Sequence, residues 1–114
     1  MNGNDPRRRA KPSTAADTRK SFCVGVFDSG IGGVSVLRAI HASLPQLDLL
    51  YVADSEHAPY GSLRDADIRQ RAHSVTKFLV QQGADAVVMA CNTATAIAIQ
   101  TLRQTYSCPI VGME

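Results

Sequence analysis

The sequence predicts an α/β fold in which helices cover both faces of a parallel sheet. Two observations lead to this prediction. Short apolar runs rich in valine, isoleucine, leucine and phenylalanine begin near residues 22, 47, 86 and 109, as is typical of strands that are buried on both faces. Between these runs, apolar residues recur at the spacing of an amphipathic helix. The resulting order, βαβαβαβ, requires right-handed crossovers between parallel strands.

The first half of this pattern contains two strands and one helix. A strand is predicted at residues 22–27, and a glycine-rich turn follows it at residues 28–33. The next helix stops before Pro45, and its apolar residues share one face: Val36, Leu37, Ile40 and Leu44. A second strand is predicted at residues 47–53, which ends where the chain reaches Asp54.

The second half begins with a polar loop at residues 54–61 and a helix that ends at Gly83. Four apolar residues form the inward face of this helix: Ile68, Ala72, Val75 and Leu79. Three basic residues are expected to face water: Arg69, Arg71 and Lys77. A third strand is predicted at residues 86–90, a third helix from about Thr95 to Tyr106, and the start of a fourth strand at residues 109–112.

Residues 1–20 differ in composition from the rest of the chain. They hold six basic residues against Asp5 and Asp17, a net charge of +4, which leaves −2 for residues 21–114. The basicity thus belongs to a tail poor in apolar residues, predicted to be disordered, and does not indicate nucleic-acid binding. No apolar run approaches the roughly 20 residues of a membrane-spanning helix. Three cysteines without a disulfide or zinc spacing favour a reducing cytoplasm.

Residues that can bind a ligand or react with it follow three of the predicted strands. Seven of them are candidates for a ligand site: Asp28, Ser29, Tyr60, Gly61, Cys91, Asn92 and Thr93. Because parallel strands end at the same edge of a sheet, we expect these residues to surround one crevice. A thiol at Cys91 would face the unpaired N–H groups of the next helix, which favour a thiolate that acts as a base or nucleophile. The alternative is that Cys91 is a small buried hydrophobe.

This set of residues suits a small zwitterion, because helix N-termini bind carboxylates and Asp28 can meet an ammonium group. Other sites fit less well. Ser35 stands where a dinucleotide-binding motif has its third glycine. Asp54 and His57 lack the tight spacing of metal ligands, so we expect no metal. Lys77 is the only lysine outside the tail and offers no pocket for a pyridoxal phosphate Schiff base.

Three blocks of the sequence resemble the glutamate racemases of the aspartate/glutamate racemase family. They are VFDSGIGG at residues 26–33, DSEHAPYG at residues 54–61 and ACNTAT at residues 90–95. The resemblance implies a cofactor-independent isomerase that interconverts L- and D-glutamate and supplies D-glutamate for peptidoglycan. In that family one cysteine thiolate removes the α-proton and a second thiol reprotonates the opposite face. Cys91 matches the first of these cysteines, and the other six candidates match substrate-binding positions.

The family's second cysteine belongs to a second α/β domain, in a Gly-Cys-Thr-His type of motif that these 114 residues do not contain. Cys108 precedes the fourth strand and should lie at the opposite end of the sheet from Cys91, while Cys23 lies inside the first strand. We therefore expect residues 21–114 to form the N-terminal racemase domain and to be inactive alone. Two alternatives remain: an aspartate racemase of the same superfamily, and a non-catalytic fragment whose exposed apolar face leads to a homodimer.

Overall fold

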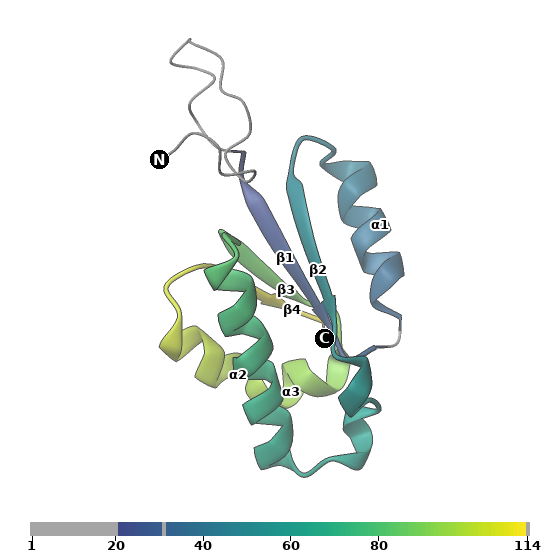
Figure 1. Cartoon of the computed structure of the whole chain (residues 1–114), viewed down its shortest axis with the longest axis vertical. Helices are drawn as coiled ribbons and strands as arrows, with labels where there is room; N and C mark the ends of the chain where they lie inside the picture. Colours follow the sequence, from purple (N-terminus) through teal and green to yellow (C-terminus); the bar gives the residue numbers. More distant parts are fainter. Residues whose placement is uncertain (1–20, 31, 114) are drawn as a thin grey trace.

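The computed structural model describes residues 21–30 and 32–113 (Figure 1). The tail at residues 1–20, which the sequence predicts to be disordered, lies outside these residues. Within the described part of the chain, every helix is too short or too polar to cross a membrane.

Four parallel strands form one sheet in the order β2-β1-β3-β4. Their bounds are β1 Cys23–Asp28, β2 Asp48–Ala53, β3 Ala86–Met89 and β4 Ile110–Gly112. The chain passes from β1 outward to β2, then returns across β1 to β3 and continues to β4. The direction of winding therefore reverses between β1 and β3. In open α/β sheets, ligands bind at the carboxyl ends of the two strands that flank such a reversal.

Helices lie on both faces of the sheet, which confirms the predicted fold class. Helix α1 (Gly33–Ser43) lies on one side, and α2 (Asp65–Gln81) and α3 (Asn92–Thr105) lie on the other (Figure 1). Two short 3₁₀ helices, η3 (Ser55–His57) and η4 (Tyr60–Ser62), occupy the loop between β2 and α2.

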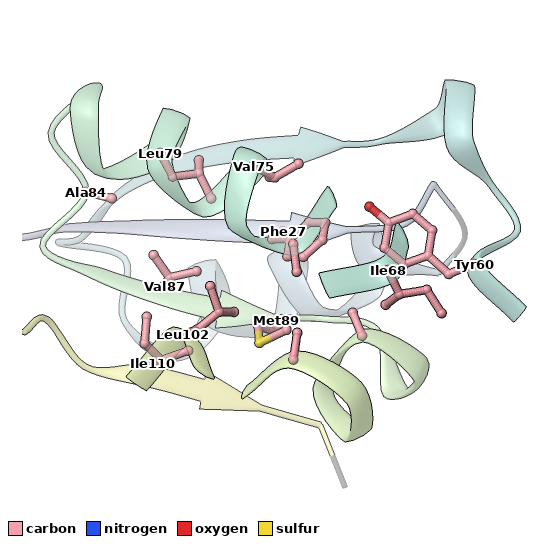
Figure 2. Close-up of a cluster of buried hydrophobic side chains, with 13 residues drawn as sticks. Phe27, Tyr60, Ile68, Val75, Leu79, Ala84, Val87, Met89, Leu102 and Ile110 are labelled. Atoms are coloured by element: carbon pink, nitrogen blue, oxygen red, sulfur yellow. The ribbon is translucent and has the colours of Figure 1, made fainter. Parts of the chain in front are cut away.

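The hydrophobic core lies between the sheet and the layer of α2 and α3 (Figure 2). Strand residues Phe27, Val87 and Met89 are completely buried in it. The four residues predicted to form the inward face of α2 are all buried: Ile68, Ala72, Val75 and Leu79. Gly25 lets α2 approach β1 closely, because a Cβ at this position would lie 3.1 Å from the Leu79 side chain.

Two predictions for the helices need correction, and the packing of α1 adds a finding. The third helix begins at Asn92, three residues before the predicted start, because Cys91 caps it. Arg71 does not face water like Arg69 and Lys77, but turns toward the loop after β2. The apolar residues of α1 are incompletely buried, and Leu44 at its end is 45% exposed, because α1 is the only described helix on its side of the sheet.

Candidate functional site

The loops that follow β1 and β3 leave the sheet side by side. Phe27 pairs with Met89 in the sheet, and the Ala90 amide donates a hydrogen bond of 2.7 Å to the Phe27 carbonyl. Asp28 is the next residue after Phe27, and Cys91 is the next after Ala90. The structure thus brings the Asp28 and Cys91 segments to the point where the winding of the sheet reverses, as expected for a ligand site.

Cys91 is the N-cap residue of α3. Its backbone is extended, with φ −137° and ψ 119°, and its Sγ accepts a hydrogen bond of 3.4 Å from the Ala94 amide. The Cys91 carbonyl accepts hydrogen bonds from the Thr95 amide at 3.0 Å and the Thr95 hydroxyl at 2.9 Å. Sulfur therefore faces the unpaired N–H groups and the positive end of the helix dipole, which favour a negative charge. The residue is only partly buried, so its thiol is not sealed inside the core.

The two carboxylate oxygens of Asp28 have different surroundings. Oδ2 accepts hydrogen bonds from the Gly33 amide and from the Tyr51 hydroxyl, both at 2.9 Å. Oδ1 is buried and has no hydrogen-bond partner among the described residues. A buried oxygen without a donor is costly. A cationic group of a ligand would supply the missing donor.

The turn after β1 depends on glycine. The backbone φ is +116° at Gly30 and +85° at Gly32, a region that other residues rarely adopt. At Gly33 a Cβ would lie 2.5 Å from the Asp28 Cγ, so only glycine lets this amide reach the carboxylate. Ser29 is buried in this turn.

The side chain of Tyr60 is buried in the core. The ring lies 6.1 Å from that of Phe27, centroid to centroid, and the two appear together in the buried cluster (Figure 2). The Tyr60 hydroxyl donates a hydrogen bond of 2.6 Å to Asp54. Any contact between Tyr60 and a ligand is thus left to its backbone. The neighbouring Gly61 is exposed, and η4 packs against α3 near the remaining candidate residues.

Asp54 joins the loop after β2 to helix α2. Its carboxylate accepts two hydrogen bonds from the Arg71 guanidinium, at 2.8 and 2.9 Å, besides the one from Tyr60. The ring of His57 lies 3.1 Å from the second carboxylate oxygen. Burial raises the pKa of Asp54, but the hydrogen bonds from Arg71, Tyr60 and His57 and the charge of Arg71 outweigh it and lower this pKa to about 2. Burial and the Asp54 charge raise the pKa of Tyr60, which therefore stays a neutral donor.

The sequence held a signal for the position of Arg71. It lies three residues after Ile68 and four before Val75, so helical spacing places it with the buried face of α2. We predicted that Arg71 is exposed because it is charged. The hydrogen bonds to Asp54 compensate for the water that this side chain loses. Tyr51 was also missed. No sequence pattern connects it with Asp28, because their contact requires β2 to lie beside β1.

The three cysteines do not meet. Cys91 follows β3, whereas Cys108 precedes β4, and these strands are parallel neighbours. The two thiols therefore lie toward opposite ends of the sheet, as predicted. Cys23 is buried at the start of β1. Among the described residues, Cys91 is thus the only thiol at the edge that carries Asp28.

A hollow of about 660 Å³ lies along α3, and Asn92, Thr95 and Met113 are among the residues that line it. Arg69 of α2 lines the same hollow and adds a positive charge to it. Asp28 and Cys91 do not border this hollow. Asn92 is exposed and Thr93 is partly buried at the first turn of α3. Asn92 therefore belongs both to the turn beside Cys91 and to the hollow along the helix.

Comparisons with known proteins agree with the sequence blocks. The model of the Asp/Glu/Hydantoin racemase family matches residues 24–114. A glutamate racemase of Methylococcus capsulatus is 57% identical over 91 residues, which are 80% of this chain and 34% of that protein. The structure of glutamate racemase from Aquifex pyrophilus aligns with a TM-score of 0.78 at 36% identity, over 80% of this chain and 36% of its own.

The Escherichia coli glutamate racemase, solved with L-glutamate and the activator UDP-MurNAc-ala, aligns with a TM-score of 0.78 at 35% identity. That alignment covers 82% of this chain and 35% of the other. The chain thus spans about a third of the length of the relatives that it matches.

Proposed function

Because this chain belongs to the Asp/Glu/Hydantoin racemase family, we propose that it supplies one half of the active site of a glutamate racemase. The observation that carries the proposal is the position of Cys91. Its partly exposed sulfur accepts a backbone N–H at the first turn of α3, next to the strand that ends in the buried carboxylate of Asp28. A base and an acceptor for an ammonium group thus lie at the two strand ends where the sheet favours ligands.

In the proposed reaction the Cys91 thiolate takes the α-proton of glutamate and becomes a thiol, while the electron pair of the C–H bond remains on the substrate as a carbanion. The N–H groups at the start of α3 stabilise negative charge on sulfur and on a nearby carboxylate. Asp28 Oδ1 accepts a hydrogen bond from the substrate ammonium group, which gives this buried oxygen its missing partner. The proton returns from an acid to complete the cycle.

Inversion needs a proton donor on the opposite face of the carbanion. Return of the proton from Cys91 restores the starting enantiomer, with solvent hydrogen exchanged at the α-carbon. Cys23 and Cys108 lie too far along the sheet to serve the opposite face. We therefore assign to this chain the chemistry of one face, with the second acid supplied from outside residues 21–114.

The remaining candidates bind the substrate's carboxylates in this proposal. Asn92 and Thr93 lie in the first turn of α3, where free N–H groups are suited to anions. The proposal also assigns to the substrate Gly61 and the backbone of Tyr60, which belong to η4, and Ser29, which follows β1. This arrangement needs no cofactor, because sulfur and oriented N–H groups supply both the base and the stabilising dipoles.

Glutamate is the proposed substrate because the matched relatives are named for it and the Escherichia coli structure contains L-glutamate. Its D enantiomer would serve peptidoglycan synthesis in the cytoplasm, and three cysteines outside any disulfide suit that reducing compartment. Aspartate is the alternative substrate, and it differs only in side-chain length. Exposed apolar residues such as Val111 and Met113 give the chain a surface for a homodimer.

The test is to incubate the chain with L- or D-glutamate in D₂O. Proton NMR follows loss of the α-proton signal, and optical rotation follows inversion. We expect slow exchange without appreciable inversion, and loss of the exchange in Cys91→Ala. Cys108→Ala is the matched control and should exchange like the unmodified chain.

Two outcomes would contradict the proposal. Exchange that is the same with and without Cys91 would remove this cysteine from the chemistry. Rapid inversion by the chain alone would show that one domain holds both acids. Repeating the incubation with aspartate separates the two substrates, since the alternative expects faster exchange of aspartate.

A further inference from the structure

Tyr51 reaches the candidate site from the strand next to β1. It pairs with Val26 in the sheet, and its hydroxyl lies 2.9 Å from Asp28 Oδ2. Asp28 itself pairs with Ala53, two residues further along β2. Tyr51 and Asp28 are therefore diagonal neighbours on one face of the sheet, a separation that an aromatic side chain spans.

Two donors from different elements hold the same oxygen of Asp28. The Gly33 amide comes from the start of α1, and the Tyr51 hydroxyl comes from β2. Together they fix the plane of the carboxylate and leave Oδ1 without a partner among the described residues. Asp28 Oδ1 is therefore already oriented before a ligand binds.

The surroundings of Asp28 differ from those of Asp54, the other buried aspartate near the ends of the strands. Asp54 is neutralised by Arg71, and both of its oxygens have partners. In the described part of the chain no basic side chain lies within ion-pair distance of Asp28. Burial and the nearby Asp28 raise the pKa of Tyr51, so its phenol remains a neutral donor at physiological pH. Unlike Asp54, Asp28 therefore has no cationic side chain beside it among the described residues.

We propose that Tyr51 is a positioning residue, which holds Asp28 so that Oδ1 meets the ammonium group of the amino-acid substrate. This inference rests on the proposed function, because it takes the ligand to be an α-amino acid. Tyr51 does not touch the ligand in this arrangement. It acts only through Asp28.

The experiment compares two ligands that differ in the ammonium group alone, glutamate and glutarate. Binding of each to the full chain is measured by NMR titration. The unmodified chain should prefer glutamate. In Tyr51→Phe, loss of one hydrogen bond to the carboxylate should weaken glutamate binding by about three- to tenfold and leave glutarate binding unchanged. Asp28→Asn should have the largest effect, because it should abolish the preference for glutamate over glutarate.

Tyr106→Phe is the matched control, since it removes a tyrosine hydroxyl at the end of α3. It should bind both ligands like the unmodified chain. Phenylalanine keeps the ring of Tyr51, so this variant should fold, and circular dichroism checks that it does. Equal weakening of glutamate and glutarate in Tyr51→Phe would show general damage to the site and overturn the proposed role.

Unchanged glutamate binding in Tyr51→Phe, with the preference lost in Asp28→Asn, would overturn the role of Tyr51 and leave the proposed function standing. A different result distinguishes failure of the proposed function itself. If the unmodified chain binds glutarate as well as glutamate, Asp28 does not recognise an ammonium group, and both proposals are wrong.

Discussion

The face of the sheet toward α2 and α3 is packed across all four strands, whereas the face toward α1 is covered over only part of its width. On the first face, Phe27, Val87 and Met89 are completely buried, and Ile110 of β4 is nearly so. On the second face, α1 packs against β1 and β2. Val111 of β4, which points to that side by strand alternation, is 52% exposed.

The two central residues of the candidate site are held from opposite faces of the sheet. Cys91 caps α3 and contacts the hydrophobic core. Asp28 is held from the α1 side by hydrogen bonds from Gly33 and Tyr51. The base therefore packs against the edge of the core, whereas the completely buried carboxylate is held by two specific donors. Substitutions in the first layer should act mainly on stability, and substitutions beside Asp28 should also act on ligand geometry.

The largest contrast is expected between leucines of the two layers. Leu79 of α2 is completely buried, whereas Leu37 of α1 is only partly buried. Leu79→Ala should lower the free energy of unfolding by about 3 to 4 kcal/mol, because it leaves a cavity in the core. Leu37→Ala should cost about 1 kcal/mol. Urea denaturation of both variants measures the difference, and equal losses would contradict the unequal packing of the two faces.

A smaller loss is expected where Arg71 ties the loop after β2 to the packed layer. The side chains of Arg71 and Asp54 are 29% and 9% exposed. Arg71→Met should lower the free energy of unfolding by about 2 to 3 kcal/mol at pH 7, because the Asp54 charge loses its partner. Arg64→Met is the matched control: its pair with Asp67 is exposed, so stability should not change measurably.

The ion pair between Arg71 and Asp54 also predicts how stability depends on pH. The pKa of Asp54 falls from an ordinary 3.8 to about 2 in the folded state, so its contribution is present above pH 4 and lost as the pH falls toward 2. The unmodified chain should lose about 2 kcal/mol of stability over this interval from this group. Arg71→Met should lose less stability over the same pH interval. Parallel acid profiles of the two proteins would refute the assignment.

A change in both stability and ligand binding is expected at the glycine beside Asp28. Gly33→Ala should cost about 2 kcal/mol, because its Cβ would lie 2.5 Å from the Asp28 Cγ. It should also weaken glutamate binding, since the amide and the carboxylate must separate. Gly61→Ala adds a Cβ with nothing within 4 Å and should leave stability within about 0.5 kcal/mol of the unmodified chain. Thermal unfolding measures the stability of both variants, and NMR titration measures their binding of glutamate.

The alternation of apolar runs and amphipathic segments predicted the strands, the helices and the parallel sheet. The same pattern brought the Asp28 and Cys91 loops to one edge, because the carboxyl ends of parallel strands must share it. Gly30 and Gly32 marked the turn after β1, and both have positive φ in the structure. These features depend on residues close together in the chain, so periodicity and turn composition reveal them.

Other features depended on which elements lie side by side, and only the tertiary structure decided them. The sequence placed Tyr60 among the candidate ligand residues, and only the structure shows that its hydroxyl bonds to Asp54 in the interior. Arg71 joins Asp54 across 17 residues, and Tyr51 joins Asp28 across 23 residues. A polar side chain turns inward only when a partner offsets its loss of water. That partner is set by the packing of β2 beside β1 and of α2 over the loop, which local sequence does not encode.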